Sequence, residues 1–461
     1  MCQTNVRQCA RMNHMGIHST DDSVTDNRDL PVRPRLLNLR FGAVQAAYWF
    51  ENCAICGFAA SYLMQFGFSL TAIGLLIACS CLVTCVLQPL IGDFADRTKR
   101  FTLKQIVCAF SAVGVVIGFG LEFSAGQTMV FVLYALATIL VVTLQPLVNA
   151  LGLAYGDKVN YGFSRGLGSV SFAIAAAFIG WAISRLGATF IDGTILVCWA
   201  ALFAFTAAFP SPARKTGASP TNTAADNPHD ALPSSGNAGS EPRGADATGI
   251  VGHGSTASED RELAANGIRF LKRYRLFAFI LLGGFLVILS HSEINAFFIR
   301  IVEPLGGGNT EMGIALAIAG VVELPMMSLY VVLRRRFSCE AILLFSASMF
   351  FVKAFATWLA FSVEALYLAM LLQAISFALY FPAIVDYAQA TMHVCDKVKG
   401  QTVLLSVHTL SLVVAGLVGG FLLDDYGLTA TMLVCCIAAA LGACVIGVAL
   451  FVARRKASAH V

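Results

Sequence analysis

Six ionisable side chains lie inside hydrophobic stretches of this chain: Glu51, His291, Glu293, Glu323, Lys353 and His408. Ionisable residues in apolar segments of membrane-spanning length are rare, and they commonly bind ions, protons or substrates. A buried carboxylate near a cation can take up and release a proton as its surroundings change. We therefore expect Glu323 to carry a proton, with Lys353 as its candidate partner. The alternative is a static buried ion pair that fixes helix packing.

Three of these residues form a second candidate proton site. His291 and Glu293 belong to the polar segment Ser-His-Ser-Glu-Ile-Asn, and His408 lies in the middle of a later apolar stretch. Because a histidine titrates near neutral pH, a pairing of these two stretches would respond to protons. Each histidine taken alone is equally consistent with a hydrogen-bonded packing residue.

Glu51 and Asn52 are candidates for substrate binding. They directly follow the aromatic run Tyr-Trp-Phe that ends at Phe50. A carboxylate and an amide beside aromatic surface suit an organic solute with polar groups. The aromatic run is also consistent with packing or with contact to lipid.

The composition is that of an integral membrane protein. Hydrophobic residues make up 57% of the chain and charged residues 13%, against about 25% charged residues in soluble domains. Runs of about 20 apolar residues are long enough to cross a bilayer. Twelve such runs predict an all-α membrane protein, and they cover residues 38–64, 71–93, 104–123, 129–151, 166–184, 189–209, 276–299, 312–333, 340–361, 365–388, 401–423 and 429–451.

The basic residues predict the orientation of the chain in the membrane. Clusters of Arg and Lys precede the first run and follow the second, eighth and twelfth, whereas the alternate loops carry only Arg185 and Arg300. Since Lys and Arg are retained on the cytoplasmic side, we expect a multi-pass protein of a bacterial plasma membrane with both termini in the cytoplasm. The net charge of +4 requires no nucleic acid partner.

Repeated motifs divide the chain into two halves. Gly74 and Gly313, the two Asp-Lys-Val copies that begin at Asp157 and Asp396, and Gly187 and Gly427 each lie about 240 positions apart, which indicates internal duplication. The segment 211–268 lacks aromatic residues and is predicted to be disordered. We therefore expect a disordered tail (1–37), a six-helix bundle (38–210), a cytoplasmic linker (211–268), a second bundle (269–452) and a short tail (453–461).

One loop resembles a known signature. The segment Gly92-Asp-Phe-Ala-Asp96-Arg97-Thr-Lys-Arg100 resembles the cytoplasmic motif of the major facilitator superfamily, although Lys99 stands where that motif usually has Gly. The resemblance implies two pseudo-symmetric six-helix bundles that alternate between states, with Asp96, Arg97 and Arg100 as gating residues. A basic loop with an incidental Asp is the alternative.

A narrower resemblance concerns Tyr161-Gly-Phe-Ser-Arg165-Gly-Leu-Gly-Ser169-Val-Ser-Phe172-Ala, which is similar to the fifth span of the lactose permease and phenylpropionate permease-like branch. It implies substrate contacts at Arg165, Phe172, Asn149 and Gln373. Asn149 stands where that branch has a carboxylate to pair with the Arg, and Phe172 replaces a Trp. Gln373 occupies one of the three positions at which that branch carries a Lys, a His and a Glu. The lactose chemistry therefore cannot be carried over directly.

These observations predict a secondary transporter that couples protons to a small organic solute, either a sugar or an aromatic or organic acid. The incomplete acid partner of Arg165 favours an anionic solute. An exporter of the same superfamily and a non-transporting membrane sensor remain alternatives. A membrane-embedded enzyme is disfavoured because no span carries a metal-binding or nucleophile motif. We expect no cofactor and no metal, and a protein that works as a monomer in the lipid bilayer.

Overall fold

The computed structural model describes residues 34–98, 100–124, 126–155, 159, 161–210, 269–393 and 396–458. Most of the predicted N-terminal tail and all of the predicted linker (211–268) therefore lie outside the described residues. The described residues form helices joined by short turns: α1 (Pro34–Asn52), η1 (Cys53–Gly57), α2 (Ala59–Gln65), α3 (Leu70–Arg97), α4 (Leu103–Glu122), α5 (Gln127–Leu153), α6 (Tyr161–Leu186), α7 (Phe190–Ala208), α9 (Arg275–Ala296), α10 (Ile299–Val302), η3 (Glu303–Leu305), α11 (Asn309–Leu333), α12 (Cys339–Trp358), α13 (Val363–Leu371), η4 (Leu372–Ala374), α14 (Phe377–Thr391), α15 (Lys397–Asp425) and α16 (Gly427–Ser458).

The predicted all-α membrane fold is confirmed. Within the described ranges, 11 helices are long and apolar enough to cross a membrane. The remaining crossing is the first, which consists of α1, the π-helical turn η1 and α2. Each of the twelve apolar runs in the sequence thus coincides with one helical segment. The chain is a multi-pass membrane protein, and its described residues supply twelve candidate crossings.

Two of the crossings are interrupted near polar residues. The first changes to a π-helix at Cys53–Gly57, directly after Glu51 and Asn52. The tenth passes through the 3-10 turn η4, which contains Gln373. Such irregular turns are frequent at functional sites, and broken helices in transporters commonly border the binding site.

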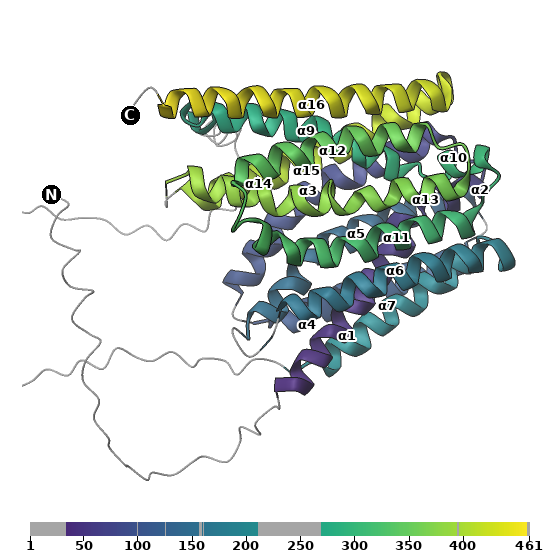
Figure 1. Cartoon of the computed structure of the whole chain (residues 1–461). Helices are drawn as coiled ribbons and strands as arrows, with labels where there is room; N and C mark the ends of the chain where they lie inside the picture. The colour runs from purple at the N-terminus through teal and green to yellow at the C-terminus, as the bar shows by residue number, and fades with distance from the viewer. Residues whose placement is uncertain are drawn as a thin grey trace, which may run out of the picture.

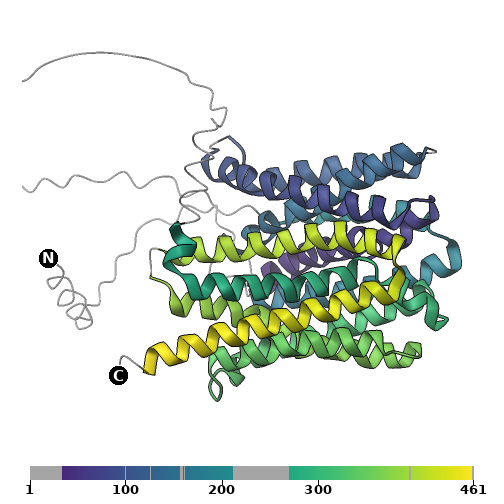
Figure 2. The ribbon, with the colours of Figure 1, turned by 90° about the horizontal axis from the view of Figure 1, so that it is seen from above.

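The helices run side by side in two halves, α1–α7 and α9–α16 (Figure 1). The main contacts between the halves are α3 with α15 and α6 with α11. The start of α1 and the end of α16 lie at the same end of the bundle, on the left in Figure 1. We call this the terminal end and the opposite one the far end. The view from above shows the same parallel arrangement (Figure 2).

At the far end the two halves meet backbone to backbone. A Cβ atom on Gly74 of α3 would lie 1.9 Å from the carbonyl oxygen of Gly416 in α15. In the other interface, a Cβ atom on Gly313 of α11 would lie 2.2 Å from the carbonyl oxygen of Ala176 in α6. No residue other than glycine leaves room for such an approach. The far end is therefore tightly closed.

Hydrogen bonds across the halves cap two helices at this closed end. The Asp424 carboxylate accepts hydrogen bonds from the backbone amides of Leu70 (3.2 Å) and Thr71 (2.7 Å), at the start of α3. The Ser184 hydroxyl accepts one from the backbone amide of Thr310 (3.1 Å), near the start of α11. Both contacts satisfy amides that have no partner within their own helix.

At the terminal end, charged groups pair within each half. Arg97 binds Asp93 of its own helix at 2.6 Å, and Arg334, directly after the end of α11, binds Asp386 of α14 at 2.6 Å. Neither ion pair links the two halves. The structure is thus closed at the far end, while these terminal-end charges are engaged locally.

Candidate functional site

The N-terminal half contributes a chain of polar and aromatic contacts. Gln45 of α1 donates to the Asn149 side-chain oxygen of α5 at 3.1 Å, and the Trp49 indole donates to Gln45 at 3.2 Å. The Arg165 guanidinium of α6 lies over the Trp49 ring, 3.9 Å from its centroid, and donates to the Ser169 hydroxyl at 2.9 Å. Three helices therefore hold an arginine over the ring of an indole.

The C-terminal half contributes two ionisable groups joined by an amide. The buried Lys353 ammonium of α12 donates to the Gln373 side-chain oxygen at 2.5 Å. The Gln373 amide nitrogen in turn donates to the Glu323 carboxylate of α11 at 2.6 Å. The structure thus brings Glu323 and Lys353 together through Gln373, a residue that the sequence assigned to substrate binding. A change of charge on Glu323 would alter the electrostatic environment of Lys353, because a single amide group bonds to both side chains.

These two sets of residues meet where α6 packs against α11. A Cβ atom on Gly166, next to Arg165, would lie 3.3 Å from the Leu324 side chain, next to Glu323. One turn away, a Cβ atom on Gly320 would lie 3.4 Å from Phe172. Arg165 also interacts electrostatically with Glu323. We call the combined set the central network; it comprises Gln45, Trp49, Asn149, Arg165, Ser169, Phe172, Glu323, Lys353 and Gln373.

Both predicted histidines lie against α14. The His291 ring stacks on Phe377 with the ring centroids 4.9 Å apart, and its Nε2 atom lies 2.9 Å from the Asn295 amide nitrogen. The His408 ring lies 5.8 Å from that of Phe381. Neither histidine makes a hydrogen bond with a residue of the central network among the described contacts. Their surroundings are mainly aromatic.

Glu293 is placed far from His408. A Cβ atom on Gly419 of α15 would lie 2.7 Å from Glu293 Cγ. Gly419 and Glu293 therefore lie at the same level along the bundle axis. Gly419 follows His408 by eleven residues, or about 16 Å along the helix axis. The helices α9 and α15 do pack together, since Ser411 donates to the Phe285 carbonyl at 3.1 Å. The charged residues of the two predicted spans nevertheless do not meet.

Glu51 faces away from the central network. It is fully buried, and the polar groups nearest its carboxylate are those of Cys198 and Trp199 on α7. Glu293 occupies a corresponding place in the second half, beside Cys435 of α16. In each half a carboxyl group on the first helix thus faces a cysteine on the last. The sequence did not indicate this relationship, because it depends on how each helix is rotated about its axis.

The remaining predicted residues are spread over the molecule. Asn52 makes a long contact with Cys56 Sγ at 3.9 Å inside the first crossing, and the Phe172 ring lies 6.4 Å from that of Trp49. Arg100 lies over the neighbouring Phe101 ring. The Asp96 side chain is outside the described part of the chain, so its predicted gating contact is not placed.

Some residues of the central network and of the far-end caps were not site candidates in the sequence analysis. Gln45 and Trp49 are four residues apart and so share one face of α1, which is a detectable signal for a polar helix face. Asp424 and Ser184 resemble ordinary residues near loops, and nothing in the sequence marks them as helix caps. No three His, Cys, Asp or Glu side chains come together as a possible metal site in the described ranges.

Comparison with known proteins identifies the family. The model of the MFS_1 like family matches residues 47–449. The chain belongs to this family. Over 399 residues, this MFS_1-like protein is 26% identical to the maltose permease of Geobacillus stearothermophilus, with 84% of this chain and 87% of the relative covered.

Solved structures of transporters share the fold of this MFS_1-like protein. The nucleoside transporter NupG aligns with a TM-score of 0.67 and 14% identity, covering 90% of this chain and 98% of the other. A D-xylose-proton symporter aligns with a TM-score of 0.59 and 13% identity, covering 89% and 96%. At these identities the likeness establishes the major facilitator fold, and the family membership makes the protein an MFS transporter.

Proposed function

We propose that this protein is a proton-coupled symporter that moves a small organic solute by alternating access. The observation that carries the proposal is the arrangement of Lys353, Gln373 and Glu323 beside Arg165, at the contact between the two halves. A proton on Glu323 would remove one charge from this network. The contact between halves is also where an alternating-access protein changes its packing.

The side chains of the central network suit a sugar. Gln45, Asn149 and Gln373 offer amide donors and acceptors for hydroxyl groups, and the Trp49 ring offers a flat apolar surface. The similarity to a maltose permease supports the same class. An organic anion is the second candidate, because position 149 holds Asn149 rather than a carboxylate and Arg165 could grip a carboxylate group.

The direction of opening follows from the charges at the two ends. At the terminal end the described basic residues include Arg40, Arg97, Arg334 and Arg454, whereas Arg185 and Arg300 are the basic residues described at the far end. By the positive-inside rule the terminal end is cytoplasmic, in the plasma membrane of a bacterium. With the far end closed, this structure corresponds to the state that releases solute into the cell.

Coupling requires that solute and proton favour the same change of state. A ligand shifts an equilibrium between two states only by its different affinity for them. When the halves rock, Arg165 on α6 and Glu323 on α11 would change their separation, so the cost of a charge on Glu323 would differ between the two states. Protonation and solute binding would then promote the transition together.

The decisive experiment uses the full chain reconstituted in tight liposomes that contain a pH-sensitive dye. Maltose, xylose, a nucleoside and an aromatic carboxylate are added in turn, with Glu323→Gln as the control variant. Acidification of the lumen with one sugar, abolished in the variant, is the expected result. Solute flux without proton movement would overturn symport, and proton release that accompanies solute extrusion would favour the exporter. Binding without flux would favour a sensor.

A further inference from the structure

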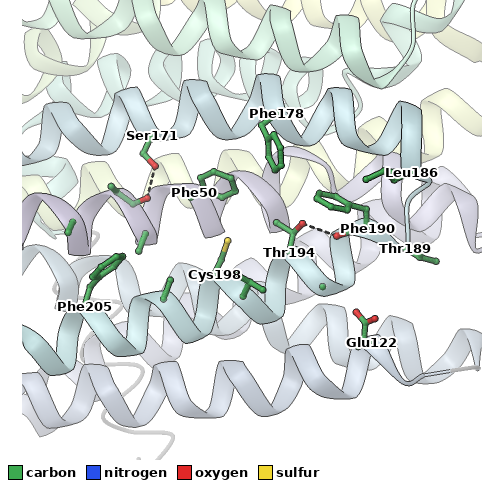
Figure 3. A pocket seen from close by; sticks show the side chains of 16 residues that line it. Phe50, Glu122, Ser171, Phe178, Leu186, Thr189, Phe190, Thr194, Cys198 and Phe205 are labelled. Carbon is green, nitrogen blue, oxygen red and sulfur yellow. Dashed lines mark hydrogen bonds between the residues drawn. The ribbon is translucent and has the colours of Figure 1, made fainter.

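A large cavity in the described part of the chain lies outside the central network. It has a volume of about 890 Å³ and is bounded by α1, α6 and α7, with one residue from the end of α4 (Figure 3). We call it the lateral groove. Helices α6 and α7 make few contacts with each other, so α1 forms the floor between them.

The lateral groove has a mainly apolar lining, and two of its polar residues use their hydroxyl groups in hydrogen bonds to the backbone. The Ser171 hydroxyl donates to the Ala46 carbonyl and the Thr194 hydroxyl to the Phe190 carbonyl, each at 2.8 Å (Figure 3). Both hydroxyl groups are therefore occupied by the backbone. The floor carries the small side chains of three alanines of α1 beside Phe50, and the walls carry aromatic rings such as those of Phe178 and Phe205. This lining favours a hydrocarbon chain.

The groove opens toward the surface that faces the bilayer. Phe178, Val197 and Phe205 line it and are 43%, 65% and 45% exposed on membrane-spanning helices. Along α7 the lining extends from Phe190 to Phe205, or about 22 Å. That length covers most of a hydrocarbon core about 30 Å thick. Any occupant that enters through this opening comes from the membrane.

Charged groups stand at the far-end limit of the groove. Glu122 at the end of α4 is exposed and belongs to the lining, and none of the ion pairs among the described residues involves it. Arg185, next to the lining residue Leu186, is exposed at the same end of α6. An anion and a cation at one end of an apolar groove complement a zwitterionic head group.

The floor of the groove is the reverse side of the central network. Ala43, Ala46 and Ala47 line the groove, whereas Gln45 and Trp49 point to the central network. With 3.6 residues per turn, these two sets lie on opposite faces of α1. An occupant of the groove would therefore support α1 from behind.

We propose that the lateral groove binds a phospholipid whose acyl chain fills the groove and whose ammonium head group pairs with Glu122. This goes beyond the proposed transport and does not depend on it. The walls of the site are present in the far-end-closed state described above.

The test is lipid retention by the full-length protein, measured by native mass spectrometry after purification in mild detergent. The probes are dioleoyl phosphatidylethanolamine and dioleoyl phosphatidylglycerol at equal concentrations. Glu122→Gln removes the anion, with Glu364→Gln, at an exposed far-end carboxylate outside the groove, as its control. Ala43→Phe fills the groove, with Val116→Phe at an exposed position of α4 as its control.

The wild type should retain one ethanolamine lipid with a preference of about two- to fivefold over the glycerol lipid, as expected for an exposed ion pair. Glu122→Gln should abolish that preference while keeping a bound lipid. Ala43→Phe should lose the bound lipid of both types, while both controls behave as the wild type. Equal retention of the two lipids by the wild type would overturn the head-group assignment. Undiminished retention by a monodisperse, normally melting Ala43→Phe variant would overturn the site.

Discussion

The Asp424 carboxylate holds Thr71 through two hydrogen bonds of 2.7 Å, one from the backbone amide and one from the hydroxyl. In the other half, Ser184 accepts the corresponding two bonds from Thr310, at 3.1 and 2.9 Å. The two contacts occupy matching places in the repeats but differ in charge. A hydrogen bond to an ionised acceptor is shorter and stronger than one to a hydroxyl. The contact between Asp424 and Thr71 is therefore the stronger of the two.

Replacing Asp424 by Asn should loosen the closed far end. The amide keeps one acceptor but loses the charge that stabilises the start of α3, worth about 0.3–1 kcal/mol. The fraction of molecules open at the far end should rise about two- to fivefold. Spin labels at positions 189 and 364, in a background without reactive cysteines, would report this opening as a longer distance.

Asp425→Asn is the matched control for that measurement. Asp425 is an exposed neighbour of Asp424, and it makes none of the described hydrogen bonds to α3. It should leave the distance distribution unchanged. Equal opening in both variants would show that overall charge, rather than the cap on Thr71, controls the far end.

Glu323→Gln should separate exchange of solute from its accumulation. The amide can still bond to Gln373 but cannot bind and release a proton. Accumulation driven by a pH gradient should fall to the level set by diffusion, while exchange of labelled for unlabelled solute continues. Paired uptake and counterflow assays would measure both. Glu340→Gln, outside the central network, should transport normally, and pH-driven accumulation by Glu323→Gln would disprove the assignment.

Gln373→Leu should destabilise the protein through Lys353. The leucine cannot accept a hydrogen bond, so the buried ammonium group would lose the partner that the structure gives it. Leaving a buried polar group unsatisfied costs about 1–3 kcal/mol. Thermal unfolding in detergent would show a lower Tm. The double variant Lys353→Met with Gln373→Leu should recover most of the loss, and an equally low Tm in the double variant would contradict this explanation.

Trp49→Ala should weaken solute binding more than it slows transport. The substitution removes the ring under Arg165 and the donor to Gln45, which together fix the side of the central network on α1. A cation over an aromatic ring contributes about 0.5–2 kcal/mol. The Kd of the solute should therefore rise several-fold. Binding calorimetry would measure it, with the exposed Trp181 replaced by Ala as the control. An unchanged Kd would place the solute elsewhere.

The sequence predicted the crossings well because hydropathy depends on composition rather than on packing. It was less informative about which buried charges meet. Lys353 was predicted as the candidate partner of Glu323, but the sequence did not indicate that the 3-10 turn in the tenth crossing places Gln373 between them. Glu51 was expected to face a solute but turns toward α7. Helices that are apolar on most faces carry little information about their rotation.

The far-end contacts were unpredictable for another reason. Gly74 and Gly313 were recognised as repeat-related, but a glycine in a sequence does not show what approaches it. Asp424 directly follows the predicted span 401–423, and nothing in the sequence distinguishes it from other acids near a span end. Its role arises only when α15 and α3, separated by hundreds of residues, are packed together.

Main-chain contacts such as that between Gly74 and Gly416 can be disrupted by a substitution but hardly strengthened, since there is no side chain to improve. The strength of the closed end can therefore be adjusted mainly at positions 184 and 424. Position 184 holds a serine, which binds the α6–α11 interface weakly, and position 424 holds an aspartate, which binds the α3–α15 interface more strongly. We therefore expect the two interfaces to open one after the other. The interface between α6 and α11 would separate first, and the interface between α3 and α15 would serve as the hinge.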